Sequence, residues 1–284
     1  MDESLVTYPA PGKLNLFLRV TGRRADGYHL LQTVFRFIDF GDVLWFRMRQ
    51  DGRIRRVNSV LGIPADEDIC VKAAQLLQQE AQVGRGVEIR VQKRLPVGGG
   101  LGGGSSDAAT VLLALNRIWE VGLKRRDLAE LGLRLGADVP VFIFGESAFG
   151  EGIGERLQPI SLPPAWYLVL VPPLAVATRK VFEHPDLTRN STPVTITAFS
   201  VVRGHNDLEP VVCRTYPEVA EHLDWLRREA REAGFAALTG SGACVFAEFE
   251  TEAAARRVAG VLPASMNGFV AQGLDRHPLH GLAE

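Results

Sequence analysis

The sequence has little cysteine, little lysine and no excess of charge. The cysteine count and the charge balance each argue against a class of protein. Its three cysteines lie far apart and form no CxxC pair, which argues against a disulfide framework or a zinc site and suits a reducing compartment. The 32 basic residues are balanced by 33 acidic ones. We therefore expect no nucleic-acid partner, because such proteins carry a strongly basic surface. Only five of the basic residues are lysine.

Long apolar runs are also missing. The longest uncharged stretch, residues 157–178, contains five prolines, and its unbroken apolar part is shorter than the ~20 residues that a membrane-spanning helix needs. The first residues begin acidic and lack the basic and then apolar regions of a signal peptide. We therefore expect a cytoplasmic protein with no membrane partner.

The patterned segments alternate between strand-like and helix-like, which predicts an α+β protein of about two domains. In the first half, the pattern predicts strands at 14–20, 34–40, 43–49 and 87–95 and helices at 71–81, 105–121 and 125–136. In the second half, it predicts strands at 166–171, 243–249 and 268–274 and helices at 217–233 and 252–262. A proline-rich passage around Leu162–Pro164 separates the halves, so we expect domains at 1–158 and 159–284.

The glycine-rich segment LPVGGGLGGGSSDAA (95–109) is the most informative part of the chain. Six of the seven residues 98–104 are glycine, and glycine lets the backbone wrap closely around a ligand. A well-patterned helix follows, with Ser105 or Ser106 expected to cap its start. Amide groups at a helix N-terminus attract anions, so this segment predicts a polyphosphate site. A flexible linker is the weaker interpretation, because patterned elements flank the segment on both sides.

Two familiar phosphate-binding motifs do not account for this segment. Gly98, Gly100 and Gly103 formally match GxGxxG, but a dinucleotide-binding fold needs a buried parallel strand before the loop and a second strand after the helix. Here the preceding strand is amphipathic, and another helix follows. The P-loop pattern fails because no lysine follows the glycines.

Three charged residues stand out near apolar segments. Lys13 follows a Pro/Gly turn and enters an apolar strand, where it could neutralise a transferring phosphoryl group or simply lie at the surface. Lys93 precedes the glycine run, with the same two interpretations. Asp138 precedes Val-Pro, a good N-cap context, but it could equally accept a proton from a substrate hydroxyl. The residues themselves leave these alternatives open.

Three segments in order, PAPGKLNLFL (9–18), LPVGGGLGGGSSDAA (95–109) and LTGSGACVFA (238–247), resemble the galactokinase, homoserine kinase, mevalonate kinase and phosphomevalonate kinase (GHMP kinase) superfamily. Further resemblance lies in residues 24–42, 135–145 and the near-terminal NGFVAQG and HPLH, and it covers nearly the whole chain. It is closest to a member acting on a cytidine-diphosphate-linked sugar alcohol in the non-mevalonate route to isoprenoids. The implied fold is an N-terminal ribosomal-protein-S5-like ATP domain and a C-terminal ferredoxin-like α/β sandwich.

The resemblance implies that the γ-phosphoryl group of ATP is transferred to the 2-hydroxyl of that alcohol, with Mg²⁺ as a further cofactor. Lys13 and Asp138 match the catalytic pair. The ATP-binding positions are Lys93, Pro96, Val97, Gly98, Gly99, Gly100, Leu101, Gly102, Gly103, Gly104, Ser105 and Ser106. The substrate-binding positions are Asn15, Tyr28, His29, Thr178, Phe182, Gly240, Ser241 and Gly242.

Some expectations stay open at this point. The magnesium ligands are unassigned, with Ser105 or Ser106 the best guess, and the chain could be a monomer or a homodimer. Gly12 stands where the family usually has alanine, which should loosen the turn before Lys13. Two alternatives remain for the function. The chain could be a sister kinase acting on another small alcohol, or a non-catalytic nucleotide-binding protein.

Overall fold

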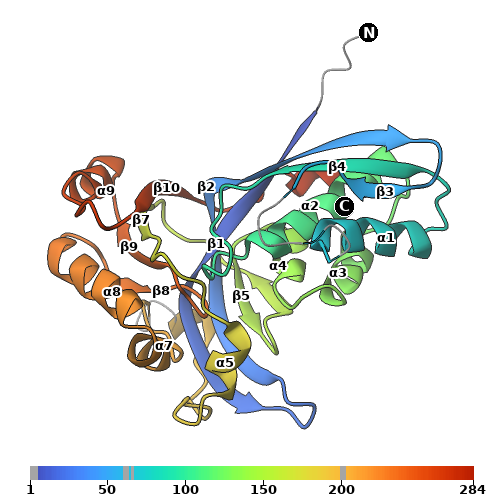
Figure 1. The fold of residues 1–284 in the computed structure, drawn as a ribbon. Coiled ribbons are helices and arrows are strands. Elements are labelled where there is room, and N and C mark those ends of the chain that lie inside the picture. The colour runs from blue at the N-terminus through green and yellow to red at the C-terminus, as the bar shows by residue number, and fades with distance from the viewer. Residues whose placement is uncertain (1–5, 60–63, 65–66, 199–202) are drawn as a thin grey trace.

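A computed structural model describes residues 6–59, 64, 67–198 and 203–284. Its central feature is an antiparallel pair of long strands, β1 (Thr7–Arg23) and β2 (His29–Arg49), which runs through the middle of the molecule (Figure 1). The segments 34–40 and 43–49, predicted as separate strands, are joined in β2. They join because a methyl group added at Gly41 would lie 2.3 Å from the carbonyl oxygen of Ala10, so only glycine lets β1 and β2 stay paired there.

The N-terminal half places its helices together beside the long strands (Figure 1). Their bounds are α1 (Ile69–Glu80), α2 (Gly103–Ile118), α3 (Arg125–Leu133) and α4 (Val139–Phe144). The sheet is extended by β3 (Ile54–Arg56), β4 (Gly86–Gln92), β5 (Ala148–Glu151) and β6 (Arg156–Pro159). Apolar side chains of α1, α2 and α4 fill one core cluster with those of β2 and β4.

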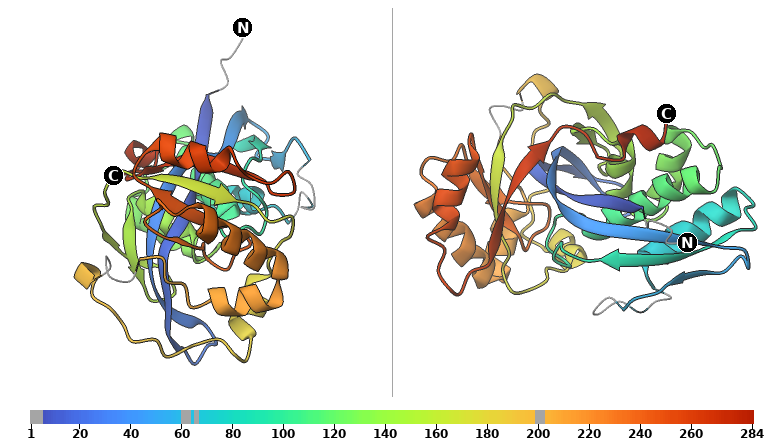
Figure 2. Two further views of the ribbon diagram at one scale, coloured as in Figure 1. Left: turned by 90° about the vertical axis from the view of Figure 1, so that its left-hand side faces the viewer. Right: turned by 90° about the horizontal axis from the view of Figure 1, so that it is seen from above.

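The C-terminal half lies on the other side of the long strands, where α7, α8 and α9 pack together (Figures 1 and 2). Its strands are β7 (Trp166–Leu170), β8 (Ala236–Leu238), β9 (Val245–Phe249) and β10 (Gly268–Leu274). Its helices are α5 (Thr178–Glu183), α7 (Glu209–Thr215), α8 (Pro217–Glu229), α9 (Glu252–Ala259) and the short turns η1 (Ile196–Ala198) and η2 (His280–Leu282).

One path of paired strands crosses both halves, in the order β3-β4-β2-β10-β7-β9-β8. It is continuous because β10 pairs with β7 along most of its length and then with β2 at Gly273 and Leu274. The domain boundary after residue 158 stays a prediction. None of the helices in the described part of the chain has the length and apolar content that crossing a bilayer requires.

The start of α2 corrects the predicted serine cap. The cap position is Gly102, in the left-handed conformation, and no side chain caps the helix. The hydroxyl of Ser106 instead donates to the carbonyl oxygen of Pro11 at 2.7 Å. The serine therefore ties α2 to β1, a contact that depends on tertiary packing. The short elements β5, β6, α5 and α7 were not predicted either, because segments of four to seven residues carry little periodicity.

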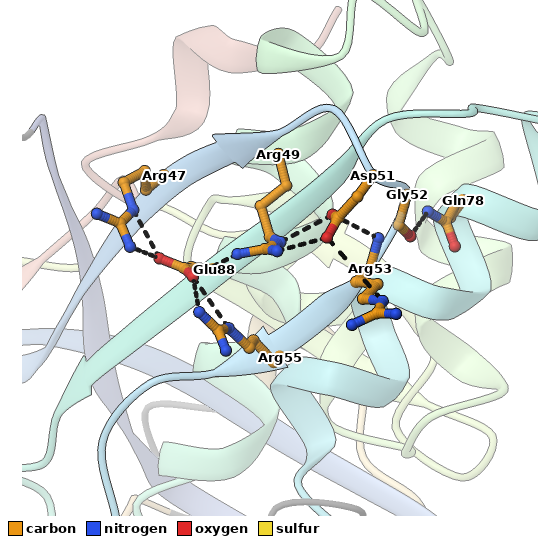
Figure 3. A network of polar contacts seen from close by, with 8 residues as sticks. All are labelled: Arg47, Arg49, Asp51, Gly52, Arg53, Arg55, Gln78 and Glu88. Atoms are coloured by element: carbon orange, nitrogen blue, oxygen red, sulfur yellow. Dashed lines mark hydrogen bonds and ion pairs between the residues drawn. The ribbon is translucent and has the colours of Figure 1, made fainter.

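Arginines on the outer edge of the N-terminal sheet converge on one carboxylate (Figure 3). Glu88 of β4 is buried and accepts hydrogen bonds from Arg47 and Arg49 of β2 and from Arg55 of β3. The hydrogen bonds from Arg55, and then from Arg47, lower the pKa of Glu88 to about 2 against the opposing effect of burial. This carboxylate therefore joins three strands at the sheet edge.

Candidate active site

The ammonium group of Lys13 lies at the centre of the candidate site. Lys13 is 2% exposed, and a buried charge needs close partners. Its Nζ donates to Asn15 Oδ1 at 2.6 Å and to the Gly100 carbonyl oxygen at 2.9 Å. It also lies 3.4 Å from Asp138 Oδ2. Lys13 is therefore not a solvated surface lysine, and the structure brings the two predicted catalytic residues together.

Asp138 stands at the cap position of α4, but its side chain makes no capping hydrogen bond. The capping interpretation is therefore wrong for the carboxylate. The side chain is 37% exposed, so one side of the carboxylate faces Lys13 and the rest is open to a ligand. An exposed acceptor beside a buried ammonium is an arrangement suited to proton transfer.

The segment before Lys13 does not form the expected turn. Gly12 lies within β1, and the pairing with β2 shifts register between Pro11 and Lys13, which marks an irregularity in the strand. A methyl group added at Gly12 would meet side-chain atoms of Leu95 and Ile38 at 3.0 and 3.2 Å. The expected turn is therefore wrong, because the backbone continues as a strand through an irregularity at Gly12; the loosening expected of glycine at this position stays a prediction.

Asn15 lies behind Lys13 rather than at an open surface. Its side chain is buried. Its Oδ1 accepts from Lys13, its Nδ2 donates to Thr33 Oγ1 at 2.8 Å, and its backbone N–H donates to Thr239 Oγ1 at 3.0 Å. These bonds orient the amide oxygen toward the ammonium. Asn15 thus positions Lys13 from the side opposite the open part of the site.

The glycine run forms a tight loop that leads directly into α2. Gly98, Gly100 and Gly102 have φ values of 71°, 78° and 72°, a region that side chains with a Cβ rarely adopt. Val97, on the outside of the loop, is 59% exposed. The loop therefore reaches the N-terminus of α2 with a backbone that carries few side chains, which is the geometry that favours an anion.

The third glycine segment packs against this loop. The backbone N–H of Ala243 donates to Gly98 O at 3.1 Å, and that of Cys244 donates to Gly99 O at 3.0 Å. Gly240 also approaches the catalytic lysine, because a methyl group added there would lie 3.3 Å from Lys13 Nζ. Segments distant in the sequence therefore form one wall of the site.

Lys93 lies beside the loop but is held by two carboxylates. Its Nζ donates to Asp107 Oδ2 at 2.8 Å and to Asp42. Asp42 also accepts from the backbone N–H groups of Arg94 and Leu95 at 2.5 and 2.9 Å. Lys93 is thus neither a solvated lysine nor a free cation; it anchors the strand that enters the loop. Sequence reasoning missed both aspartates, which lie in the quoted motifs but were given no role.

The Asp42–Lys93–Asp107 cluster carries two acids for one base. Burial raises the pKa of Asp107 to about 8, with the charge of Lys93 opposing and that of Asp42 adding to this effect. Burial lowers the pKa of Lys93, but the carboxylates of Asp107 and Asp42 outweigh it and leave that pKa above its ordinary value. Asp107 Oδ1 has no hydrogen-bond partner among the described residues. The cluster therefore favours keeping a proton on Asp107 near neutral pH.

The predicted base-binding residues lie at the far end of the β1–β2 hairpin. The rings of His29 and Phe182 are in contact, with centroids 5.1 Å apart and planes inclined by 31°. Tyr28 is 58% exposed and has no ring contact with another described residue. Thr178, at the start of α5, shares a 2.8 Å hydrogen bond with Ser241. The structure thus joins these residues to the third glycine segment through Thr178.

The comparisons with known proteins agree with this geometry. A family model for the GHMP kinases N-terminal domain matches residues 68–146, and one for the GHMP kinases C-terminal part matches residues 181–268. A protein of Nitrosospira multiformis is 62% identical over 283 residues, covering 100% of this chain and 96% of that protein. A protein of Thiobacillus denitrificans is 61% identical, covering 96% of this chain and 97% of that protein. Both are named 4-diphosphocytidyl-2-C-methyl-D-erythritol kinase.

Solved structures extend the comparison to the fold. A crystal structure of 4-(cytidine 5'-diphospho)-2C-methyl-D-erythritol kinase matches with a TM-score of 0.81 and 33% identity, over 94% of this chain and 99% of that one. A crystal structure of mevalonate kinase has a TM-score of 0.71 and 15% identity, over 95% of this chain and 100% of that one, and shares the fold alone.

The fold and the family models define the class of this protein: the chain belongs to the GHMP kinase family. Kinases of this family use ATP. Within the family, the two relatives and the first of these structures are named for one activity, that of the kinase acting on 4-diphosphocytidyl-2-C-methyl-D-erythritol. The predicted two-part α+β architecture is confirmed.

Proposed function

We propose that this protein transfers the γ-phosphoryl group of ATP to the 2-hydroxyl of 4-diphosphocytidyl-2-C-methyl-D-erythritol, in the non-mevalonate route to isoprenoids. The products are the 2-phosphate and ADP. The observation that carries this proposal is the ion pair of Lys13 and Asp138 beside the glycine loop. The identity of the acceptor alcohol is supported by the relatives' names.

Asp138 and Lys13 have complementary roles in the transfer. The substrate oxygen forms a bond to the γ-phosphorus while the bond to the β–γ bridging oxygen breaks, and the hydroxyl proton passes to the Asp138 carboxylate. The adjacent ammonium pairs with that carboxylate and neutralises charge that develops on the phosphoryl oxygens. Asn15 and the Gly100 carbonyl hold the ammonium in place for both tasks.

The glycine loop, residues 96–106, binds the phosphates of ATP. Its glycine-rich backbone and the N-terminus of α2 supply amide donors and a positive dipole. Lys93 contributes by anchoring the loop, because Asp42 and Asp107 already engage its ammonium. The resemblance counts Lys93 among the ATP-binding positions, and its hydrogen bonds to the two carboxylates favour the anchoring role.

Mg²⁺, bound together with ATP, would supply positive charge to the phosphoryl groups. It keeps several waters and needs only one or two protein oxygens. Among the described residues, no group of three or more His, Cys, Asp or Glu could hold a metal ion. Ser106 is unsuited, because its buried hydroxyl donates to Pro11. Ser105, half-buried and without a hydrogen bond among the described residues, is the hydroxyl that fits.

The cytidine diphosphate part binds along the hairpin end and the third glycine segment. Cytosine stacks on the ring of Phe182, with Tyr28 closing over it and His29 at its edge, because bases are well held by aromatic faces. The diphosphate lies near Gly240, Ser241 and Gly242, and Thr178 orients Ser241 through their hydrogen bond.

A product assay tests this function directly. The protein is incubated with Mg·ATP and, separately, the cytidylyl alcohol, mevalonate or homoserine, and products are detected by mass spectrometry. We expect a mass gain of one phosphoryl group only with the cytidylyl alcohol, and inhibition by CDP. Turnover of another alcohol without inhibition by CDP would point to a sister kinase, and ATP binding without any product would point to a non-catalytic protein.

A further inference from the structure

Arg189 lies in the segment after α5, where the sequence analysis predicted no site residue. Its guanidinium group has five N–H donors and makes five hydrogen bonds. The Nε atom donates to His29 Nε2 at 3.1 Å, across 160 positions of the chain. The two terminal nitrogens donate to four carbonyl oxygens, at distances of 2.7 to 3.4 Å, on Phe182, His184, Pro185 and Leu187.

These bonds hold two parts of the predicted base pocket in one position. Carbonyl groups at the end of a helix lack intrahelical partners, and Arg189 satisfies that of Phe182 at the end of α5. The same guanidinium reaches His29, the first residue of β2. The contact between the Phe182 and His29 rings is therefore fixed through Arg189 from both sides.

The bond also determines where the proton of His29 lies. Arginine stays charged and cannot accept a hydrogen bond, so His29 Nε2 must be the acceptor. A neutral imidazole with an accepting Nε2 carries its hydrogen on Nδ1. Burial lowers the pKa of His29, and the charges of Arg189 from the segment after α5 and Arg23 from β1 lower it further. The ring is thus neutral near pH 7 and offers one defined donor.

We propose that Arg189 is a positioning residue for nucleobase recognition: it fixes His29 as the Nδ1–H tautomer and holds it against the Phe182 ring, so that the pocket presents one set donor beside one aromatic face. This inference rests on the proposed function, because that function puts cytosine at these residues. A single set donor suits a base whose edge carries acceptors, as cytosine does at O2 and N3.

Arg189→Gln and Arg23→Gln form a matched pair for the test. Both remove a positive charge near His29, but Arg23 donates to the Gly27 carbonyl oxygen and not to the imidazole. We expect Arg189→Gln to raise KM for the cytidylyl substrate about tenfold while KM for ATP changes less than twofold. Arg23→Gln should leave both values within twofold. Arg189→Lys, which keeps the charge but not the planar fork, should fall in between.

Histidine ¹⁵N NMR supplies a readout that general destabilisation would not move. With the His29 signals assigned from His29→Gln, the intact protein should show the Nδ1–H tautomer and a His29 pKa below the ordinary value. Arg189→Gln should show mixed tautomers and a higher His29 pKa than the intact protein, whereas Arg23→Gln should keep the tautomer. An unchanged His29 tautomer in Arg189→Gln would overturn the inference, as would equal rises in both KM values.

The experiment separates this inference from the proposed function. CDP binding to the intact protein is measured by calorimetry alongside turnover. If neither binding nor turnover is found, the proposed function fails, and nucleobase recognition by Arg189 fails with it, whatever the NMR shows. If both are found and Arg189→Gln binds CDP as tightly as the intact protein, only the role of Arg189 fails. A thermal unfolding scan identifies any variant that does not fold. If Arg189→Gln does not fold, the KM values and the His29 tautomer are measured in Arg189→Lys instead.

Discussion

Gly100 of the glycine loop and Thr239 of the third glycine segment are in backbone contact. A methyl group added at residue 100 would lie 2.2 Å from the carbonyl oxygen of Thr239, and the φ value of Gly100 is 78°. The hydroxyl of the same threonine accepts from the backbone N–H of Asn15 on β1. The glycine loop, β1 and the C-terminal half therefore meet without room for a side chain at residue 100.

Gly100→Ala should impair both folding and nucleotide binding. Left-handed backbone strain alone costs about 1–2 kcal/mol, and the contact with Thr239 must also open. We expect a loss of about 2 kcal/mol or more in the free energy of unfolding by urea, and a raised KM for ATP. Gly84→Ala, where the added methyl group meets nothing within 4 Å, is the control and should change the free energy of unfolding by less than about 1 kcal/mol.

Asp138→Asn should abolish proton acceptance while the site keeps its shape. We expect kcat to fall by about 10²–10⁴-fold, with the affinity for ATP nearly unchanged in a binding titration. Asp127→Asn, on the surface in the first turn of α3, serves as the control. If Asp138→Asn retained near-normal kcat, its carboxylate would have no part in proton transfer.

Asp107 should make the protein less stable as the pH rises. The folded-state pKa of about 8 lies above the unfolded value of about 3.9, so between these values the folded state binds more protons and stability falls with increasing pH. A difference of one pKa unit corresponds to roughly 1.4 kcal/mol. Because the charge of Lys93 opposes part of the effect, we expect the free energy of unfolding to fall by about 1–3 kcal/mol from pH 5 to 8.

Urea unfolding at pH 5, 6, 7 and 8 measures this loss. Asp107→Asn resembles the protonated carboxyl group and should flatten the pH dependence, whereas Asp127→Asn should follow the parent protein. A parent protein whose stability stays level or rises over this range would contradict a proton held on Asp107.

Phe182→Ala should weaken binding of the cytidylyl substrate selectively. Stacking of a base on an aromatic ring contributes about 1–3 kcal/mol, which corresponds to a KM raised roughly 5- to 150-fold. KM for ATP should stay within twofold, because the Phe182 ring lies against that of His29 at the end of the β1–β2 hairpin. Tyr28→Ala should act in the same direction. Equal increases in the two KM values would remove both rings from the base pocket.

Local sequence patterns were sufficient for most long elements. The apolar periodicity of residues 105–121 placed α2 correctly within a few residues, and the phosphate-binding role of the glycine run before it stays a prediction. The short elements β5 and α5 escaped detection, because their few residues carry little pattern and form through packing against other parts of the chain.

The chain's own order of residues determined which chemical groups are available: a bare glycine loop before a helix, one lysine in an apolar strand and one aspartate at a helix start. Only tertiary packing decided which groups meet. It set Lys13 3.4 Å from Asp138, gave Lys93 to two aspartates rather than to solvent, and brought Arg189 to His29. The physical reason is that backbone propensities act over a few neighbouring residues, whereas the partner of a buried charge is chosen among groups that folding brings close from anywhere in the chain.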